Sequence, residues 1–202
     1  MPDTIQIFTF LFLMLGPFKI IGPFVKMSKG TDPALMRGIA IKAAIFATLG
    51  LLITAFIGES LLAKFGIPVS ILALTGGLIL FLVALSNVLQ QYTPSGADVA
   101  HEPPTTGMAM TPLAFPTIVT PYGIAAVIVF MAISPDLHSQ LVIGAIIIGI
   151  MALNLLMMLL TRFIGKLLFL GLSLLGSVLG VIQVALGLMI IYNQVKVLFN
   201  LS

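Results

Sequence analysis

The sequence predicts an all-α integral membrane protein with six transmembrane helices, arranged as two inverted three-helix repeats. Three observations support this fold class. Of 202 residues, 60% are hydrophobic and 7% are charged, whereas a soluble domain carries about a quarter charged residues. Six apolar stretches each reach the roughly 20 residues that cross a bilayer as a helix. The two halves of the chain also share features at an offset of about one hundred residues.

The six expected spans are joined by short connections, except at the middle of the chain. We expect the spans near residues 4–25, 38–58, 67–90, 112–134, 138–161 and 167–195. Helices of a soluble bundle would each keep a polar face, and residues 72–89 and 141–160 have none. A polar loop at 91–111 separates a first three-span repeat (1–90) from a second (112–202), within one transmembrane domain.

Lysine and arginine are distributed unevenly between the two sides of the expected membrane protein. One side holds Lys26, Lys29, Arg37, Lys42, Arg162 and Lys166, and the other holds Lys64 and Lys196. Cytoplasmic loops carry an excess of these residues, so we expect the first side to be cytoplasmic. Both termini are then extracytoplasmic, in a bacterial plasma or inner membrane.

Each half contains three spans, and this odd number determines how the halves are related. The second half must enter the membrane from the opposite side, so two halves with a shared fold form inverted repeats. Pro17 in the first span falls opposite Pro116 in the fourth, and Ala84-Leu85 falls opposite Ala185-Leu186. Inverted repeats are typical of secondary transporters, whose substrate site lies near the midplane between the repeats.

The first and fourth spans contain prolines that should interrupt them. Gly16-Pro17 and Gly22-Pro23 lie in the first span, and Pro112, Pro116 and Pro121 lie in the fourth. A proline in a helix interior costs about 3 kcal/mol, and the backbone groups that it frees need protein partners or a watery cavity. The prolines either produce ordinary kinks that aid packing, or they create two pairs of half-helices.

Paired half-helices suit a zwitterionic solute. Their N-termini favour a carboxylate, and their C-terminal carbonyl groups favour an ammonium. Lys19 adds a charge deep in the first span, where a lysine costs about 2.5–3.5 kcal/mol on insertion scales. Either its ammonium binds a substrate carboxylate or titrates during transport, or its long side chain extends to the cytoplasmic headgroups.

These residues resemble the motifs of the MarC family, which includes a small neutral amino acid transporter. The family's P-L-A-x-P followed by G-P-G-x-I stands here as residues 112–116 and 120–124, and its F-G-I and paired glycine stand as residues 65–67 and 76–77. The first-half motif N-P-x-G-N-x-P-x-F is partly kept in residues 16–24. The resemblance covers nearly the whole chain.

The resemblance implies transport of small neutral amino acids by alternating access, linked to protons. The chain departs from the family at Gly16, which replaces asparagine, and at Lys19, Thr120 and Tyr122, which each replace glycine. These departures change bulk and charge beside the expected site. The expected substrate-binding residues are Pro17, Lys19, Ile20, Ile21, Gly22, Thr117, Val119, Thr120, Tyr122 and Gly123. Residues expected to contact helices or line the site are Gly76, Gly77 and Gln183.

Other classes of function find less support in the residues. An intramembrane enzyme needs paired aspartates, a Ser/His dyad or a zinc motif, but both histidines (His101 and His138) and all aspartates fall outside the spans. We expect no enzyme activity, metal, cofactor or nucleic-acid partner. The expected partners are an amino acid and the lipid bilayer. An oligomeric channel, or a structural membrane protein without carrier activity, is the alternative to a transporter.

Overall fold

The computed structural model describes residues 3–28, 30–90, 105–134, 136–161 and 166–199, with only the backbone described at 90 and 166–175. The described residues are helical between short connections and contain no strand. The elements are α1 (Thr4–Leu15), α2 (Phe18–Ser28), α3 (Pro33–Phe65), α4 (Val69–Gln90), η1 (Thr106–Ala109), η2 (Met110–Ile118), α5 (Pro121–Ala132), α6 (Leu137–Leu160) and α7 (Lys166–Leu198).

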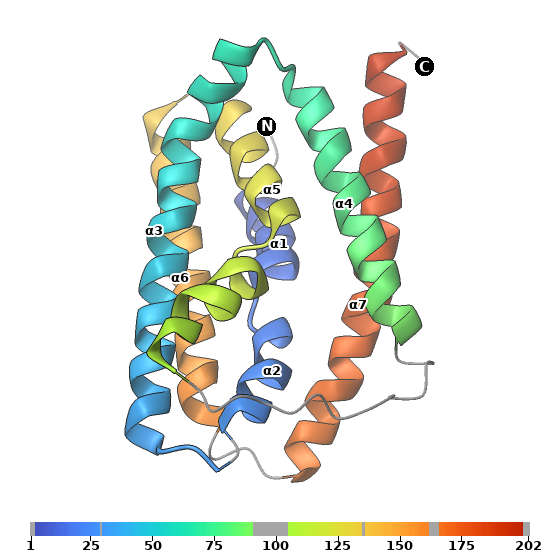
Figure 1. Ribbon diagram of the computed structural model, residues 1–202. Helices are drawn as coiled ribbons and strands as arrows, with labels where there is room; N and C mark the ends of the chain where they lie inside the picture. Colours follow the sequence, from blue (N-terminus) through green and yellow to red (C-terminus); the bar gives the residue numbers. More distant parts are fainter. Residues whose placement is uncertain (1–2, 29, 91–104, 135, 162–165, 200–202) are drawn as a thin grey trace.

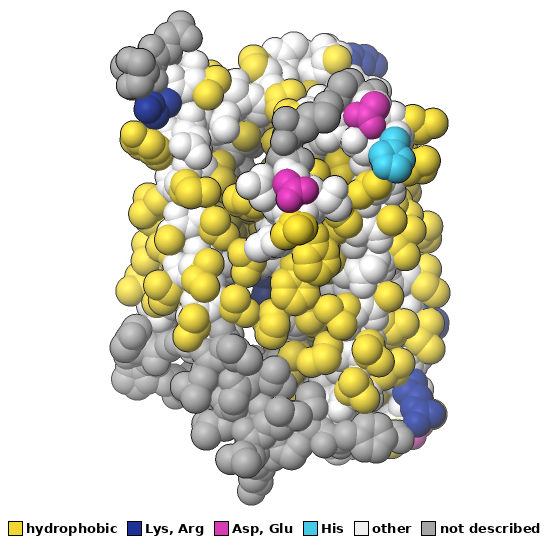
Figure 2. Space-filling model, turned by 180° about the vertical axis from the view of Figure 1, so that it is seen from behind, with side chains coloured by type: hydrophobic (Ala, Val, Ile, Leu, Met, Phe, Trp, Pro, Cys, Tyr) yellow, Lys and Arg dark blue, Asp and Glu magenta, His cyan; other side chains and the backbone are white. Residues whose placement is uncertain are grey.

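These elements confirm an all-α membrane fold with five to six candidate spans. Among the described residues, five helical segments are long and apolar enough to cross a bilayer, with α1 and α2 together forming the first. The segment 106–118 and α5, bent by 63°, supply a sixth. Large apolar side chains cover the face shown in Figure 2, while charged side chains gather mainly toward its two ends.

The two halves of the chain run through the molecule in opposite directions. The two ends of the chain lie at the same end of the molecule, which we call the terminal end (Figure 1). The first half starts there, and the second half starts at the other end. Corresponding helices of the halves pack together, α3 against α6 and α4 against α7. This arrangement is that of an inverted repeat.

Local sequence explains where the long helices begin. The carboxylate of Asp32 accepts a hydrogen bond from the backbone N–H of Ala34, and Pro33 occupies the first position of α3. The carboxylate of Asp136 accepts from the N–H of Ser139 at 2.8 Å before α6, and this bond lowers the pKa of Asp136. Such caps satisfy N–H groups that the helix itself leaves unpaired.

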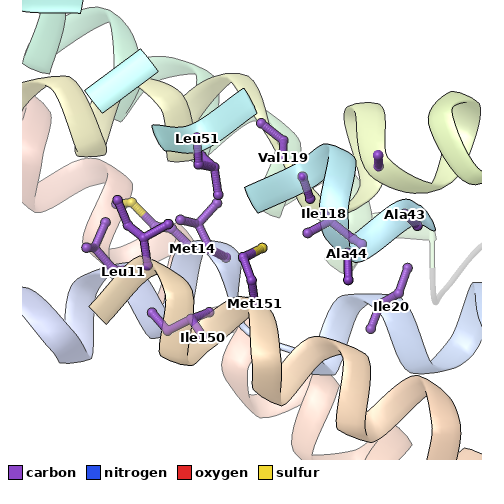
Figure 3. Packing of buried hydrophobic residues seen from close by; sticks show 14 of the residues in the cluster. Leu11, Met14, Ile20, Ala43, Ala44, Leu51, Ile118, Val119, Ile150 and Met151 are labelled. Carbon is purple, nitrogen blue, oxygen red and sulfur yellow. The ribbon is translucent and has the colours of Figure 1, made fainter. Parts of the chain in front are cut away.

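Two different kinds of packing hold the helices together. Around α1, α3 and α6, Leu11, Met14, Leu51, Ile150 and Met151 converge in a hydrophobic core (Figure 3). Buried alanines along α3 allow its neighbours to approach closely, as small residues do in membrane proteins.

The α4–α7 pair depends on glycine instead. A Cβ on Gly187 would lie 2.8 Å from the backbone of Phe81, and one on Gly77 would lie 2.7 Å from the Ile190 side chain. These two glycines therefore allow α4 and α7 to pack at short distance, and the pair forms one flank of the molecule (Figure 1).

Both predicted interruptions are present, each at a residue that precedes a proline. Gly16 takes φ −70° and ψ 169° before Pro17, and Thr120 takes φ −89° and ψ 151° before Pro121. Steric conflict with the proline ring disfavours the helical conformation at such positions. The same conformation is found at Thr111 and Phe115, which makes η2 irregular.

The interruption of the first span is narrower than the sequence suggested. The helix α2 continues through Pro23, because its packing against α6 and α7 offsets a single lost hydrogen bond. The fourth span breaks at residues 119–120, before Pro121, and Pro116 lies within η2. Pro17 and Pro116 each follow a non-helical residue, Gly16 and Phe115, and their correspondence in the two repeats stays a prediction. Residues 106–110, expected in the central loop, are helical, and residues 91–104 lie outside the described part.

Candidate functional site: a cavity between the two broken spans

Lys19 connects the two broken spans. It is the second residue of α2, directly after the first break, and its side chain is partly buried. Its ammonium donates hydrogen bonds to the carbonyl oxygen of Met14 and, at 2.6 Å, to the hydroxyl oxygen of Tyr122. The Nζ atom also lies 4.5 Å from the centroid of the Tyr122 ring. The side chain is therefore held within the protein and does not extend to the cytoplasmic headgroups.

The carbonyl groups at the C-terminal end of α1 are satisfied by side chains from three different helices. A helix leaves its last four carbonyl groups without intrahelical partners. The oxygen of Phe12 accepts from the backbone N–H of Gly16 at 2.8 Å. The next three oxygens accept from side chains, namely Leu13 from Gln183 Nε2, Met14 from Lys19 Nζ and Leu15 from Asn154 Nδ2.

This arrangement corrects one expectation from the sequence. We expected the C-terminal carbonyl groups to bind the ammonium of a substrate, but the protein supplies its own donors to them. Asn154 is only 1% exposed, and its Nδ2 lies 2.8 Å from the Leu15 oxygen. The ammonium of Lys19 stands where we had placed the ammonium of the solute.

The other side of the site is the first turn of α5. The Thr120 hydroxyl accepts from the backbone N–H of Gly123 at 3.2 Å and so caps this helix. A Cβ on Gly123 would collide with the side chain of Leu15. This glycine therefore allows α5 to approach the end of α1.

A cavity of about 400 Å³ lies between the broken spans and the α4–α7 pair. Its lining residues come from both breaks and from the halves of α4 and α7 far from the terminal end. They are Leu13, Gly16, Phe18, Lys19, Val83, Asn87, Pro116, Thr117, Thr120, Tyr122, Gly176, Leu179, Gly180 and Gln183. The volume is within the range of small-molecule sites, about 300–1,000 Å³. We call this space the inner cavity.

The structure brings five of the residues expected from the sequence into this lining: Lys19, Thr117, Thr120, Tyr122 and Gln183. The other expected residues lie beside it. Ile20, Ile21 and Val119 are buried in the apolar interior, Pro17 is buried at the break, Gly22 is partly exposed, and Gly123 packs against Leu15.

Several lining residues were not predicted, although some carried a signal. Asn87 is a polar residue in an apolar span, and Gly176 and Gly180 form a G-x-x-x-G pattern. Among the described residues, no heavy atom lies within 4 Å of a Cβ placed on Gly176, so this glycine makes no close contact with a described helix. Val83, Leu179 and Phe18 are apolar residues in apolar spans and carry no such signal.

A second cavity of about 420 Å³ lies toward the terminal end, between α1, α5 and the α4–α7 pair. It is mainly apolar, and it includes Gly76 and Gly77 of α4 with Asn193 and Gln194 near the end of α7. We call it the outer cavity. Tyr122 lines both cavities and thus stands between them. Among the described residues, no group of three or more His, Cys, Asp or Glu side chains is placed to hold a metal ion.

Comparison with known proteins identifies the family. A family model described as MarC family integral membrane protein matches residues 1–199. The chain belongs to the MarC family. The MarC motif residues 112–116 form the irregular segment η2, and residues 120–124 form the cap and first turn of α5. The second-half motif of the family therefore builds one wall of the inner cavity.

Similar proteins are known as membrane proteins. A UPF0056 membrane protein of Methanocaldococcus jannaschii is 28% identical over 194 residues, which are 94% of each chain. The UPF0056 inner membrane protein YhgN of Escherichia coli is 27% identical over 149 residues, 73% of each chain. A UPF0056 membrane protein of Buchnera aphidicola is 23% identical over 200 residues, covering 99% of this chain and all of the relative. No solved structure matches the chain.

Proposed function

We propose that this MarC-family protein is a secondary transporter for a small solute that carries a carboxylate, in the first place a small neutral amino acid. The observation that carries the proposal is the Lys19 ammonium, which joins both broken spans inside the inner cavity. A charged group in the membrane interior is costly and marks a solute or ion pathway. Broken helices that meet near the midplane are the usual place for a substrate in transporters built from inverted repeats.

The hydrogen-bonding capacity of Lys19 supports a carboxylate ligand. An ammonium has three N–H donors, and contacts within the described part of the chain use two of them. The third is available to an anionic group in the inner cavity. Asn87 and Thr117 also line this cavity and offer oxygen acceptors to the ammonium of a zwitterion.

The two cavities support a mechanism of alternating access. Both lie between the broken spans and the α4–α7 pair, and Tyr122 separates them. A movement of the α4–α7 pair relative to the broken spans would open one cavity as it closes the other. The glycine-mediated contact between α4 and α7 allows these two helices to move together.

Uptake by purified protein in liposomes tests the proposal. We expect saturable uptake of at least one of glycine, alanine, serine, threonine or valine. Replacement Lys19→Met should abolish uptake, because it removes the donors for the carboxylate, while Lys196→Met near the terminal end should leave it unchanged. Retained helical content of the Lys19→Met protein controls for misfolding.

The same panel of amino acids should also stabilise the purified protein. A ligand at 100 times its dissociation constant contributes about 2.7 kcal/mol to stability. Uptake that never saturates would indicate a channel. If no solute of the panel is transported and none stabilises the protein, the transporter proposal is overturned. Unchanged uptake by Lys19→Met would remove Lys19 from the site.

A further inference from the structure

We propose that the C-terminal end of α1 is a site for a small monovalent cation, and that the Lys19 ammonium permanently occupies it in place of a free ion. The site consists of the Met14 carbonyl oxygen and the Tyr122 hydroxyl. Shortening Lys19 should empty the site and let a cation from solution bind. The inference deepens the proposed transport function, but its test needs no transport.

The end of α1 is electrostatically suited to a cation. The C-terminus of a helix carries about −0.5 elementary charge from its aligned carbonyl dipoles. The neighbouring oxygens of Leu13 and Leu15 accept from the neutral amides of Gln183 and Asn154. Only the Met14 oxygen, between them, accepts from a charged donor.

The Tyr122 hydroxyl adds a second oxygen acceptor to the site. The Nζ of Lys19 lies 2.6 Å from this hydroxyl, and Tyr122 is only 3% exposed. A hydrogen bond to a charged group is stronger than one between neutral groups, and more so where water is excluded. The hydroxyl and the carbonyl together form a pocket for positive charge.

Among the described residues that line the inner cavity, none is an aspartate or glutamate. Within the described part, the positive charge is therefore held by the carbonyl and hydroxyl dipoles, and no ion pair neutralises it. In many transporters the carbonyl groups at such breaks hold a coupling cation. A cation attached covalently at this position makes binding of a carboxylate independent of sodium.

The first experiment replaces the removed part of the side chain with a free amine. Lys19→Ala removes three methylene groups and the ammonium, and propylammonium contains these same groups. At ten times its dissociation constant, propylammonium should raise the unfolding midpoint of the purified variant by about 3–6 °C. The original protein should show no such shift, and tetramethylammonium, which has no N–H donor, should shift the variant less.

The second experiment uses the absence of cysteine from the sequence. In Lys19→Cys the introduced thiol is the only one, and alkylation with 2-bromoethylamine, which expels bromide, restores an ammonium at nearly the length of lysine. Alkylation with iodoacetamide adds a neutral amide and serves as the matched control. Restoration of the unfolding midpoint by the aminoethyl group alone is the expected result. The thiol is modified after purification, so this variant still tests the cation site if the alanine variant does not fold.

The outcomes separate the two proposals. If neither propylammonium nor aminoethylation stabilises its variant more than the neutral control, no cation site exists at this position. If the original protein takes up no solute of the panel and none stabilises it, but the Lys19 variants are stabilised as expected, the transport function is overturned and the cation site remains. If the transport function and the cation site are both confirmed, uptake by the original protein should be equal in sodium and potassium buffers. A requirement for sodium would contradict the proposal that Lys19 replaces a free cation.

Discussion

The contact between Lys19 and Tyr122 provides the sharpest test of the site. Tyr122→Phe removes the hydroxyl that lies 2.6 Å from Nζ but keeps the ring. A hydrogen bond to a charged group contributes about 1.5–3 kcal/mol. In a double-mutant cycle with Lys19→Met, we expect a coupling energy of about 2 kcal/mol between the two side chains. This value corresponds to a roughly 30-fold change in the unfolding equilibrium constant.

The assay is the unfolding free energy of the four proteins in the same lipid or detergent. The chain offers a matched control in Tyr192 and Lys196, where Nζ lies 5.6 Å from the ring centroid and the tyrosine is 62% exposed. Exposed cation–π contacts are worth about 0.5–1 kcal/mol, and the phenylalanine variant keeps the ring, so this cycle should give a coupling energy near zero. A coupling energy for Lys19 and Tyr122 no larger than that of the control would refute the reasoning.

Three further substitutions test other parts of the structure. Gly16→Ala places a methyl group against a backbone oxygen of α1 and should reduce both stability and uptake, whereas Gly22→Ala, with no atom within 4 Å, should be tolerated in both assays. Thr120→Ala removes the cap of α5 and should cost about 1 kcal/mol in unfolding free energy, while Thr120→Ser should restore most of it. Gly187→Ala puts a Cβ 2.8 Å from the backbone of α4, so its unfolding midpoint should fall well below that of Gly144→Ala, which has open space.

The fold was predictable because hydrophobic length dominates in a membrane protein. Long apolar runs that enter a membrane form helices, because every backbone polar group must be satisfied internally. The Gly-Pro and Thr-Pro pairs at 16–17 and 120–121 locate both breaks within a few residues. The extent of the breaks was less predictable. Whether a proline such as Pro23 ends a helix depends on the packing around that helix, which sequence alone does not reveal.

The site was only partly predictable, for two physical reasons. Successive residues of a helix point about 100° apart, so Lys19 faces the inner cavity while Ile20 and Ile21 turn into the apolar interior. The partners of the α1 carbonyl groups are also distant along the chain, with Asn154 139 residues and Gln183 170 residues from the oxygens that they contact. A polar residue in an apolar span indicates that it has a hydrogen-bond partner, but the sequence does not identify that partner.

The three side chains that bind the end of α1 are synthesised at very different times, because they lie far apart along the chain. Asn154 follows Leu15 by 139 residues. Chains grow at about 5–20 residues per second, so Asn154 is synthesised roughly 7–28 s after Leu15. Until then the oxygens of Leu13 and Leu15 lack the side-chain partners that they have in the folded protein. Lys19, five residues from Met14, is present almost at once. Of the three side chains that bind the end of α1, the one that we place at the solute site is therefore the first to be synthesised.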